Sequence, residues 1–246
     1  MKILAVIPSR YASTRFPGKP LVDIQGKPMI QWVYENASKA IENVFVATDD
    51  ERIFSLVTNF GGKAVYTSKN HNTGTDRCAE ALDKIKSKLD INFEIVLNIQ
   101  GDEPLLQPEQ ITSLIDCFKD PKTEIATLIK KINDYDELVN PNNVKITFNK
   151  DFYAMYFSRS TIPCIRNAKD VKEWINLHKF YKHIGIYAFK SDILRRITKL
   201  QSSSLERAES LEQNRWLENG YKIKVIITEI ENIGIDTPED LKKLLK

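Results

Sequence analysis

The stretch KILAVIPSRYASTRFPGKP, residues 2–20, contains the strongest fold signal in the chain. Its first part, residues 2–8, is almost unbroken apolar sequence, which is typical of a strand buried on both faces of a parallel sheet. The part that follows is a polar loop with cations at Arg10, Arg15 and Lys19. We therefore expect a buried first strand that delivers a basic loop to the carboxyl edge of a sheet, where α/β proteins bind their ligands.

The composition of this loop indicates a site for phosphate groups. Arg10, Arg15 and Lys19 can neutralise phosphate oxygens. Ser9 adds a hydroxyl, and Gly18 allows backbone N–H groups to approach a ligand closely. The loop contains neither a Walker A pattern nor a G-x-G-x-x-G motif, so phosphate would be bound mainly by side chains. The alternative is that this segment is a solvated basic loop that binds no ligand.

The composition of the chain excludes several classes of protein. Its 246 residues carry 36 cations against 33 anions, a balance too even for a general nucleic-acid binder. A hydrophobic content of 42% and a charged content of 28% are those of an ordinary globular protein. We find no apolar stretch long enough to span a membrane. We therefore expect a cytoplasmic α/β protein that neither binds nucleic acid nor inserts into membranes.

The cysteines and histidines indicate that any metal is bound by carboxylates. The chain has three widely spaced cysteines, Cys78, Cys117 and Cys164, which fit reduced thiols better than a disulfide framework or a zinc site. It has only three histidines, so a histidine metal centre is improbable. A metal in this protein would be a hard cation such as Mg²⁺, held by Asp or Glu.

Strand-like and helix-like segments alternate over the first hundred residues. The expected strands are 2–8, 43–48, 63–66 and 93–99, and the expected helices are 28–39, 51–60 and 75–89. This alternation predicts a doubly wound, mostly parallel α/β sheet with right-handed crossovers.

The middle of the chain has a different pattern. Strand-like segments at 124–132, 143–148, 152–158 and 183–189 follow with few helices between them, which predicts a smaller mixed or antiparallel lobe. Residues 164–181 are polar and weakly patterned, so we expect a mobile loop there. Residues 204–219 are expected to form one helix with Leu205, Ala208, Leu211 and Trp216 facing inward.

Two aspartates follow strand-like segments and are candidate metal ligands. Asp102 comes after Gly101, which permits a tight bend at the carboxyl edge of the sheet. A carboxylate that faces a triphosphate needs a cation between them, and Mg²⁺ suits this role. Asp236 precedes Thr237, which we expect to cap the last helix and so leave Asp236 for other work. The alternatives are that Asp102 caps a turn and Asp236 caps the helix.

Motifs along the whole chain carry a family resemblance. They are IPSRYASTRFPGKPL (7–21), VATDD (46–50), HNTGTDR (71–77), NIQGDEP (98–104), YFSRSTIP (156–163), KHIGIY (182–187), SLEQ (210–213) and IDTPEDL (235–241). In this order they closely resemble the 3-deoxy-manno-octulosonate (Kdo) cytidylyltransferases, also called CMP-Kdo synthetases. Ser9 and Phe16 depart from that pattern, in which Ala and Leu are expected.

The resemblance implies an activity and a Rossmann-like nucleotidyltransferase fold. Such an enzyme transfers CMP from CTP to the anomeric hydroxyl of Kdo and releases pyrophosphate, as a step in lipopolysaccharide biosynthesis. In the implied mechanism, cations stabilise the triphosphate and the departing pyrophosphate, while Mg²⁺ assists deprotonation of the attacking hydroxyl.

The resemblance also assigns roles to residues. The catalytic set is Arg10, Lys19 and Asp102; the nucleotide-binding set is Ser9, Arg10, Arg15, Lys19, Arg77 and Gln100; the sugar-binding set is Gln100, Arg159, His183, Tyr187, Glu212 and Gln213; and the Mg²⁺ ligands are Asp102 and Asp236. Arg159 is the first choice for the sugar carboxylate, because its planar fork suits bidentate binding. From the residues alone, Arg159 and Glu212 could equally form a structural ion pair, and His183 and Tyr187 could simply share one strand face.

The resemblance further implies a homodimer and a division of the single domain. Residues 1–122 and 222–246 would form a nucleotide-binding core, and residues 123–221 a lobe for sugar binding and dimerisation. Two alternatives to the Kdo activity stay open: a cytidylyltransferase for another 2-keto sugar acid, such as 8-amino-Kdo or a sialic acid, and a non-catalytic nucleotide-binding regulator.

Overall fold

The computed structural model describes residues 1–12, 16–232, 234–235 and 237–244, and its chain divides into two compact units. The first unit comprises Met1–Ile115, Ile186–Thr198 and Asn232–Lys246. The second comprises Asp116–Gly185 and Lys199–Glu231. The units are described separately below, and the division into a nucleotide-binding core and a sugar-binding lobe stays a prediction.

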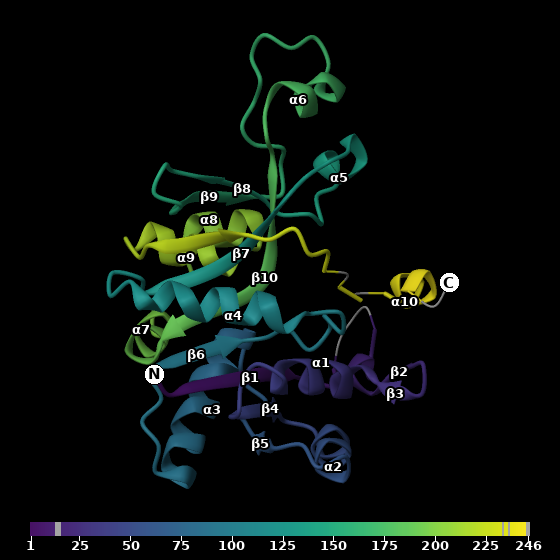
Figure 1. Cartoon of the computed structure of the whole chain (residues 1–246), viewed down its shortest axis with the longest axis vertical. Helices are drawn as coiled ribbons and strands as arrows, with labels where there is room; N and C mark the ends of the chain where they lie inside the picture. Colours follow the sequence, from purple (N-terminus) through teal and green to yellow (C-terminus); the bar gives the residue numbers. More distant parts are fainter. Residues whose placement is uncertain (13–15, 233, 236, 245–246) are drawn as a thin grey trace. The chain divides into compact units, whose positions relative to one another are not determined.

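The first unit is built on a mostly parallel sheet. Its strand order is β10 (Tyr181–Lys190, of which residues 186–190 belong to this unit), β6 (Ile95–Asn98), β1 (Ile3–Ser9), β4 (Val44–Thr48) and β5 (Ala64–Tyr66) (Figure 1). Strand β1 pairs in parallel with β4 and β6, β4 pairs in parallel with β5, and β10 pairs with β6 in the antiparallel direction. Leu4–Ile7 are fully buried, as expected for a central strand covered on both faces. The predicted fold class is confirmed.

The path of the chain through this sheet creates a site for a ligand. Helix α1 (Met29–Ser38) connects β1 to β4, and α2 (Glu51–Asn59) connects β4 to β5 on the same side of β1. Helix α3 (Gly74–Leu89) then returns the chain to β6, on the other side of β1. The strand order therefore reverses between β1 and β6, and open α/β sheets bind ligands at the carboxyl ends of the strands at such a point.

Short elements complete the first unit. They are η1 (Lys19–Leu21), β2 (Asp23–Ile24), β3 (Lys27–Pro28), α4 (Pro108–Asp116), α7 (Ser191–Ile197) and α10 (Pro238–Leu244). The N-terminus of α10 has a capping box, in which Thr237 Oγ1 accepts from Asp240 N at 3.2 Å and Asp240 Oδ2 accepts from Thr237 N at 3.0 Å. The predicted capping role of Thr237 is confirmed.

The second unit has mixed strand pairing, as predicted. Its elements are η2 (Cys117–Lys119), β7 (Ile125–Lys131), α5 (Tyr135–Val139), β8 (Lys145–Phe148), β9 (Ala154–Ser158), α6 (Val171–Leu177), the first part of β10, α8 (Ser204–Glu209), α9 (Glu212–Glu218) and β11 (Ile223–Ile227). Strand β11 runs parallel to β7, whereas β8 pairs with β9 and with β10 in the antiparallel direction.

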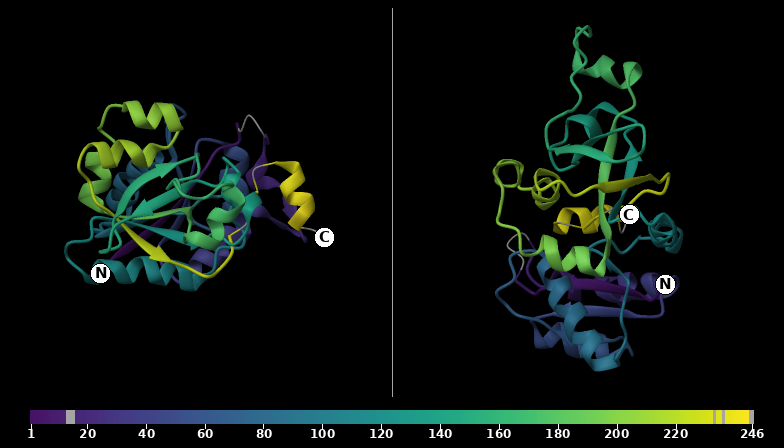
Figure 2. Two further views of the ribbon diagram at one scale, coloured as in Figure 1. Left: turned by 90° about the horizontal axis from the view of Figure 1, so that it is seen from above. Right: turned by 90° about the vertical axis from the view of Figure 1, so that its left-hand side faces the viewer.

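Two expectations for this unit were wrong in detail. The segment 164–181 contains α6, whose first turn is capped by Asp170, with the carboxylate accepting from Lys172 N at 3.0 Å. The expected helix 204–219 is two helices, α8 and α9, which lie side by side in Figure 2. The helix is interrupted at Ser210, whose φ of 52° is left-handed. Of the residues expected to face inward, Leu205 and Ala208 are exposed, whereas Leu211 and Trp216 are buried.

In the described part of the chain, no helix has the length and apolar character needed to cross a membrane.

Candidate functional site

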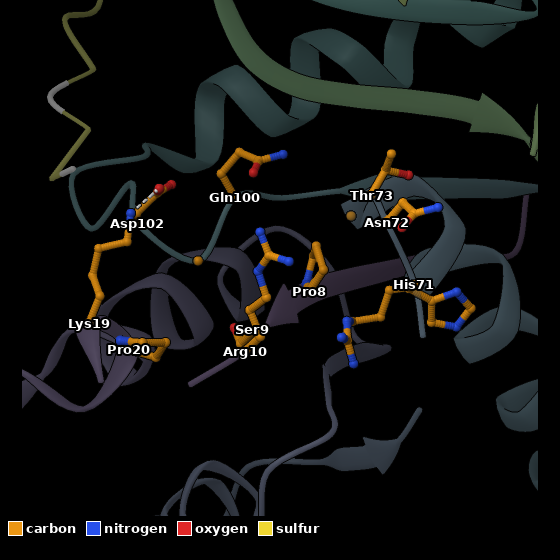
Figure 3. Close-up of a pocket in the computed structure, with 13 residues that line it drawn as sticks. Pro8, Ser9, Arg10, Lys19, Pro20, His71, Asn72, Thr73, Gln100 and Asp102 are labelled. Atoms are coloured by element: carbon orange, nitrogen blue, oxygen red, sulfur yellow. Dashed lines mark hydrogen bonds and ion pairs between the residues drawn. The ribbon is translucent and has the colours of Figure 1, made fainter. Parts of the chain in front are cut away.

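A pocket with a volume of about 240 Å³ lies in the first unit, where the strand order reverses (Figure 3). Its wall comes from the end of β1, from η1, from the start of α3 and from the loop after β6. Six predicted residues line it: Ser9, Arg10, Lys19, Arg77, Gln100 and Asp102. Segments nearly a hundred residues apart in sequence thus meet in one cavity that contains both cations and a carboxylate.

Lys19 and Asp102 form an ion pair on one side of the pocket (Figure 3). Lys19 Nζ donates to Asp102 Oδ2 at 2.6 Å, and both side chains are largely shielded from water. Gly18, with φ at 73°, turns the chain into η1 and so aims Lys19 at the pocket. The pair holds a cation and an anion side by side, where a triphosphate would meet the first and a divalent cation the second.

Gly101 allows the loop after β6 to lie directly against β1. A Cβ at this position would lie 2.8 Å from Ser9 Oγ and 3.5 Å from the carbonyl oxygen of Pro8. Ser9 is 4% exposed, and its hydroxyl has no hydrogen-bond partner among the residues that the structure describes. The predicted reason for Gly101, a tight bend, is therefore joined by a second one, which is close contact with the end of β1.

Arg77 lies in the wall of the pocket as a buried cation. Its Nη1 donates to Thr67 Oγ1 at 2.5 Å, and its Nη2 lies 3.5 Å from Asp49 Oδ1. The side chain is 4% exposed, so these two partners fix the plane of the guanidinium. A nucleotide would meet a cation with a set orientation.

Sequence reasoning missed three pocket residues, His71, Asn72 and Thr73, which lie at the opposite end from Lys19 (Figure 3). Burial opposes ionisation of Glu80, but hydrogen bonds from Lys84, the backbone of Ser68 and His71 lower its pKa to about 2. Glu80 is therefore ionised, and its contact with His71 Nε2 orients the His71 ring. The sequence contained a signal for the three pocket residues, because they belong to the same motif, HNTGTDR, as Arg77.

Glu103, next to Asp102, is a carboxyl group to which sequence reasoning assigned no role. It is 9% exposed and accepts a hydrogen bond from Asn232 Nδ2 at 2.9 Å. Burial, and after it the neighbouring Asp102, raises the pKa of Glu103 to about 7 in spite of that hydrogen bond. Adjacent residues of one loop thus differ in character, with Asp102 lining the pocket and Glu103 buried.

Tyr11 holds the two ends of the basic loop together through contacts with Gly18. The carbonyl oxygen of Tyr11 accepts from Gly18 N at 3.0 Å, and its ring lies against Gly18. The guanidinium carbon of Arg52 lies 3.2 Å from the ring centroid, and Asp50 holds this guanidinium through two hydrogen bonds of 2.9 and 2.7 Å. Helix α2 therefore supports the loop that presents Arg10 and Lys19.

We expect Arg52→Ala to raise the KM for a nucleoside triphosphate by about 2- to 5-fold, since the loop loses the cation–π contact that supports it. Arg52 is 57% exposed at its side chain, so the melting temperature should barely change. Tyr11→Phe keeps the ring and should behave as wild type. Arg195→Ala, which removes another arginine paired with an aspartate, is the matched control. An unchanged KM for the nucleoside triphosphate in Arg52→Ala would contradict the supporting role.

The predicted sugar-binding residues are divided between the two units. Gln100 and Tyr187 belong to the first unit, and Arg159, His183, Glu212 and Gln213 belong to the second. In the first unit, Gln100 lines the pocket, and Tyr187 is buried opposite Asn98 in the antiparallel pair of β10 and β6.

In the second unit, Arg159 and Glu212 have separate partners. Arg159 Nε donates to the carbonyl oxygen of Glu209 at 2.8 Å, its Nη1 donates to that of Pro141 at 3.1 Å, and its backbone N–H donates to the Glu209 carboxylate. Glu212 instead accepts from Arg215 Nη2 at 2.7 Å. The alternative of an Arg159–Glu212 ion pair is therefore wrong.

His183 is a partly buried imidazole in β10. Its Nε2 lies 2.9 Å from Thr127 Oγ1, and its ring meets the ring of Phe157 edge to face. Burial lowers the pKa of His183 to about 3. It can therefore exchange neutral hydrogen bonds with a ligand, but it does not supply a positive charge near neutral pH. Gln213 in α9 is buried as well.

Two predicted residues, Arg15 and Asp236, lie outside the described residues. Within the described ranges, no group of three or more His, Cys, Asp or Glu side chains is placed to hold a metal ion. Asp102 is the predicted metal ligand that the structure places in the pocket. This fits Mg²⁺ in nucleotide sites, which is bound through one or two carboxylates and completes its shell with substrate phosphates and water.

Comparisons with known proteins agree with this geometry. A family model described as "Cytidylyltransferase" matches residues 4–224. A 3-deoxy-manno-octulosonate cytidylyltransferase of Parabacteroides distasonis is 56% identical over 100% of this chain and 97% of its own length. A protein of the same name from Bacteroides thetaiotaomicron is 55% identical over 98% of this chain and 96% of its own.

A solved structure of CMP:2-keto-3-deoxy-manno-octonic acid synthetase complexed with CTP has the same fold. It is 41% identical, superposes with a TM-score of 0.90, and covers 100% of this chain and 97% of its own. The match extends over the pocket, the basic loop and the second unit alike. The chain therefore belongs to the cytidylyltransferase family, alongside relatives named 3-deoxy-manno-octulosonate cytidylyltransferase.

Proposed function

We propose that the protein transfers CMP from CTP to the anomeric hydroxyl of Kdo and releases pyrophosphate, the step that activates Kdo for lipopolysaccharide biosynthesis. The observation that carries this proposal is the meeting of Arg10, Lys19 and Asp102 in one pocket where the strand order reverses. Relatives that are more than half identical over nearly their whole length bear the name of this activity.

The chain's own residues position the nucleotide and neutralise its charge. The oxygen of the sugar hydroxyl forms a bond to the α-phosphorus, the bond from that phosphorus to the bridging oxygen of the β-phosphate breaks, and the hydroxyl proton is lost. Such a transfer depends on in-line positioning and on stabilisation of the leaving group. Arg10 and Lys19 would hold the phosphates and stabilise the pyrophosphate as it departs, and Arg77 would orient the nucleotide.

Mg²⁺ is the proposed cofactor, with Asp102 as a ligand and Asp236 as the second carboxylate predicted from the sequence. When bound, the ion would supply charge neutralisation at the phosphates and acidify the attacking hydroxyl. Lys19 must exchange its present partner, Asp102, for phosphate oxygens in this scheme. The ion pair thus keeps both groups in place before substrates arrive.

For the sugar acid, the residues proposed from the sequence are Gln100 and Tyr187 in the first unit and Arg159, His183, Glu212 and Gln213 in the second. Arg159 supplies the charge that a sugar carboxylate needs, while His183, being neutral, suits a hydroxyl. We also propose that the protein works in the cytoplasm, where CTP is available, and that it forms a homodimer. A monomer mass in light scattering would contradict the dimer.

The test is pyrophosphate release from CTP and Mg²⁺ with Kdo, with 8-amino-Kdo, with a sialic acid, and without a sugar. We expect release with Kdo, and a fall to background when EDTA is added, because the phosphates would lose their counter-ion. Restoring Mg²⁺ should restore the rate. Release only with another sugar acid would replace Kdo as the substrate, and tight CTP binding with no release would favour a regulator.

A further inference from the structure

The loop that carries Asp102 is held from two sides within the first unit. On one side, Asn36 Nδ2 of α1 donates to the carbonyl oxygen of Pro104 at 2.9 Å. On the other side, Ile235 N donates to the carbonyl oxygen of Asp102 at 2.9 Å. Ile235 is fully buried in an apolar cluster with Ile24 and Met29. Ile235 is therefore attached directly to the backbone of the pocket.

A second contact, between side chains, joins the same two segments. Asn232 Nδ2 donates to Glu103 Oε2 at 2.9 Å across 129 residues of sequence. Asn232 Oδ1 is also buried, with no hydrogen-bond partner among the described residues. The contact thus consists of one hydrogen bond between the Asn232 amide and the Glu103 carboxyl group. The amide oxygen of Asn232 could accept a second one.

Stability alone does not account for this pair. Burying a carboxyl group beside another carboxylate is costly, and an apolar side chain of similar size would pack there without that cost. What the pair provides is a fixed distance and orientation between two segments, which apolar contacts specify less sharply.

We propose that Glu103 and Asn232 are a positioning pair that fixes Ile235 beside Asp102 and so sets the geometry in which Asp102 binds its cation. The inference rests on the proposed function, because it assigns the pair a task in cytidylyl transfer. Neither residue needs to touch a substrate. The pair acts through the Ile235–Asp102 hydrogen bond, which it holds in register.

The structural half of the proposal is tested by hydrogen exchange without ligands. In Asn232→Ala and in Glu103→Leu, which keeps the packing volume, the Ile235 amide should exchange about 10-fold faster or more than in wild type. Glu103→Gln should retain protection, because a glutamine amide can accept from Asn232 Nδ2 and donate to its Oδ1. Glu109→Ala, which removes an exposed glutamate from α4, is the control. Wild-type protection in both disruptive variants would overturn the anchor.

The functional half is tested by titrating Mg²⁺ in the pyrophosphate-release assay with CTP and Kdo. Asn232→Ala and Glu103→Leu should need about 10-fold more Mg²⁺ for half-maximal rate, a change that corresponds to about 1.4 kcal/mol, with the KM for CTP within about 2-fold of wild type. Glu103→Gln should restore the wild-type requirement. Lost protection at Ile235 with an unchanged Mg²⁺ requirement would overturn the positioning role and leave a structural contact.

The two halves separate this inference from the proposed function. A wild-type protein that released no pyrophosphate with any of the sugar acids would overturn the function, and with it the positioning role. The exchange measurement would still decide whether the pair anchors Ile235. If Glu103→Leu fails to fold, Asn232→Ala and Glu103→Gln carry both measurements.

Discussion

Lys19→Met is expected to lower kcat/KM for CTP by about 10²–10³-fold, the usual loss when one preorganised group that stabilises transition-state charge is removed. The structure holds Lys19 in the pocket through η1 and through its 2.6 Å contact with Asp102. Methionine retains most of the length and apolar volume of the side chain. The loss should therefore reflect the missing charge.

The comparison variant is Lys27→Met. Lys27 follows Lys19 in the same part of the chain, its side chain is partly exposed, and it is paired with Glu35. Lys27→Met should retain wild-type activity. Lys19→Met should keep the wild-type Mg²⁺ requirement or lower it, because Asp102 loses its competing partner. Activity within about 3-fold of wild type in Lys19→Met would contradict the catalytic assignment of Lys19.

Local sequence signals predicted the frame of the site well. The apolar run before Ser9 and the cations after it placed the pocket at the end of the first strand, because a buried parallel strand and a basic loop leave little choice of location. The cap at Thr237 followed from Pro238 and Asp240 in the same way, since each acts within one helical turn.

Contacts between distant segments could not be predicted in this way. Glu103 stands in a recognised motif, but its partner Asn232 is 129 residues away, and no local pattern links the two. The break at Ser210 had a similar effect in the second unit. It ends α8 at Glu209, whose carboxylate accepts from the backbone N–H of Arg159, whereas Glu212 pairs with Arg215.

Helix α6 shows a third limit. The segment 164–181 is only weakly patterned, so its sequence predicted a loop. In the structure Trp174 and Ile175 pack against Phe180 and Leu138, and Asp170 caps the first turn. Tertiary contacts with α5 and with Phe180 therefore stabilise a helix that has little support from its own sequence.

His183 should make the protein measurably less stable in acid. Burial lowers its folded-state pKa to about 3, whereas an unfolded chain has a histidine pKa of about 6.5. The contribution of His183 is fully present above pH 6.5. As the pH falls from 6.5 towards 3, the unfolded state binds a proton that the folded state does not, and the free energy of unfolding decreases by about 1.4 kcal/mol per pH unit.

The measurement is the free energy of unfolding by urea at pH 7.5, 6.5, 5.5 and 4.5 for wild type and His183→Gln. Carboxylates titrate alike in both proteins, so the difference between the two curves isolates His183. That difference should shift by about 2–3 kcal/mol in favour of the variant between pH 6.5 and 4.5. Parallel curves for His183→Gln and wild type would mean that His183 accepts its proton in the folded state, and that the imidazole is open to charge. In that case His183, and not Arg159 alone, would be available to bind the carboxylate of the sugar acid.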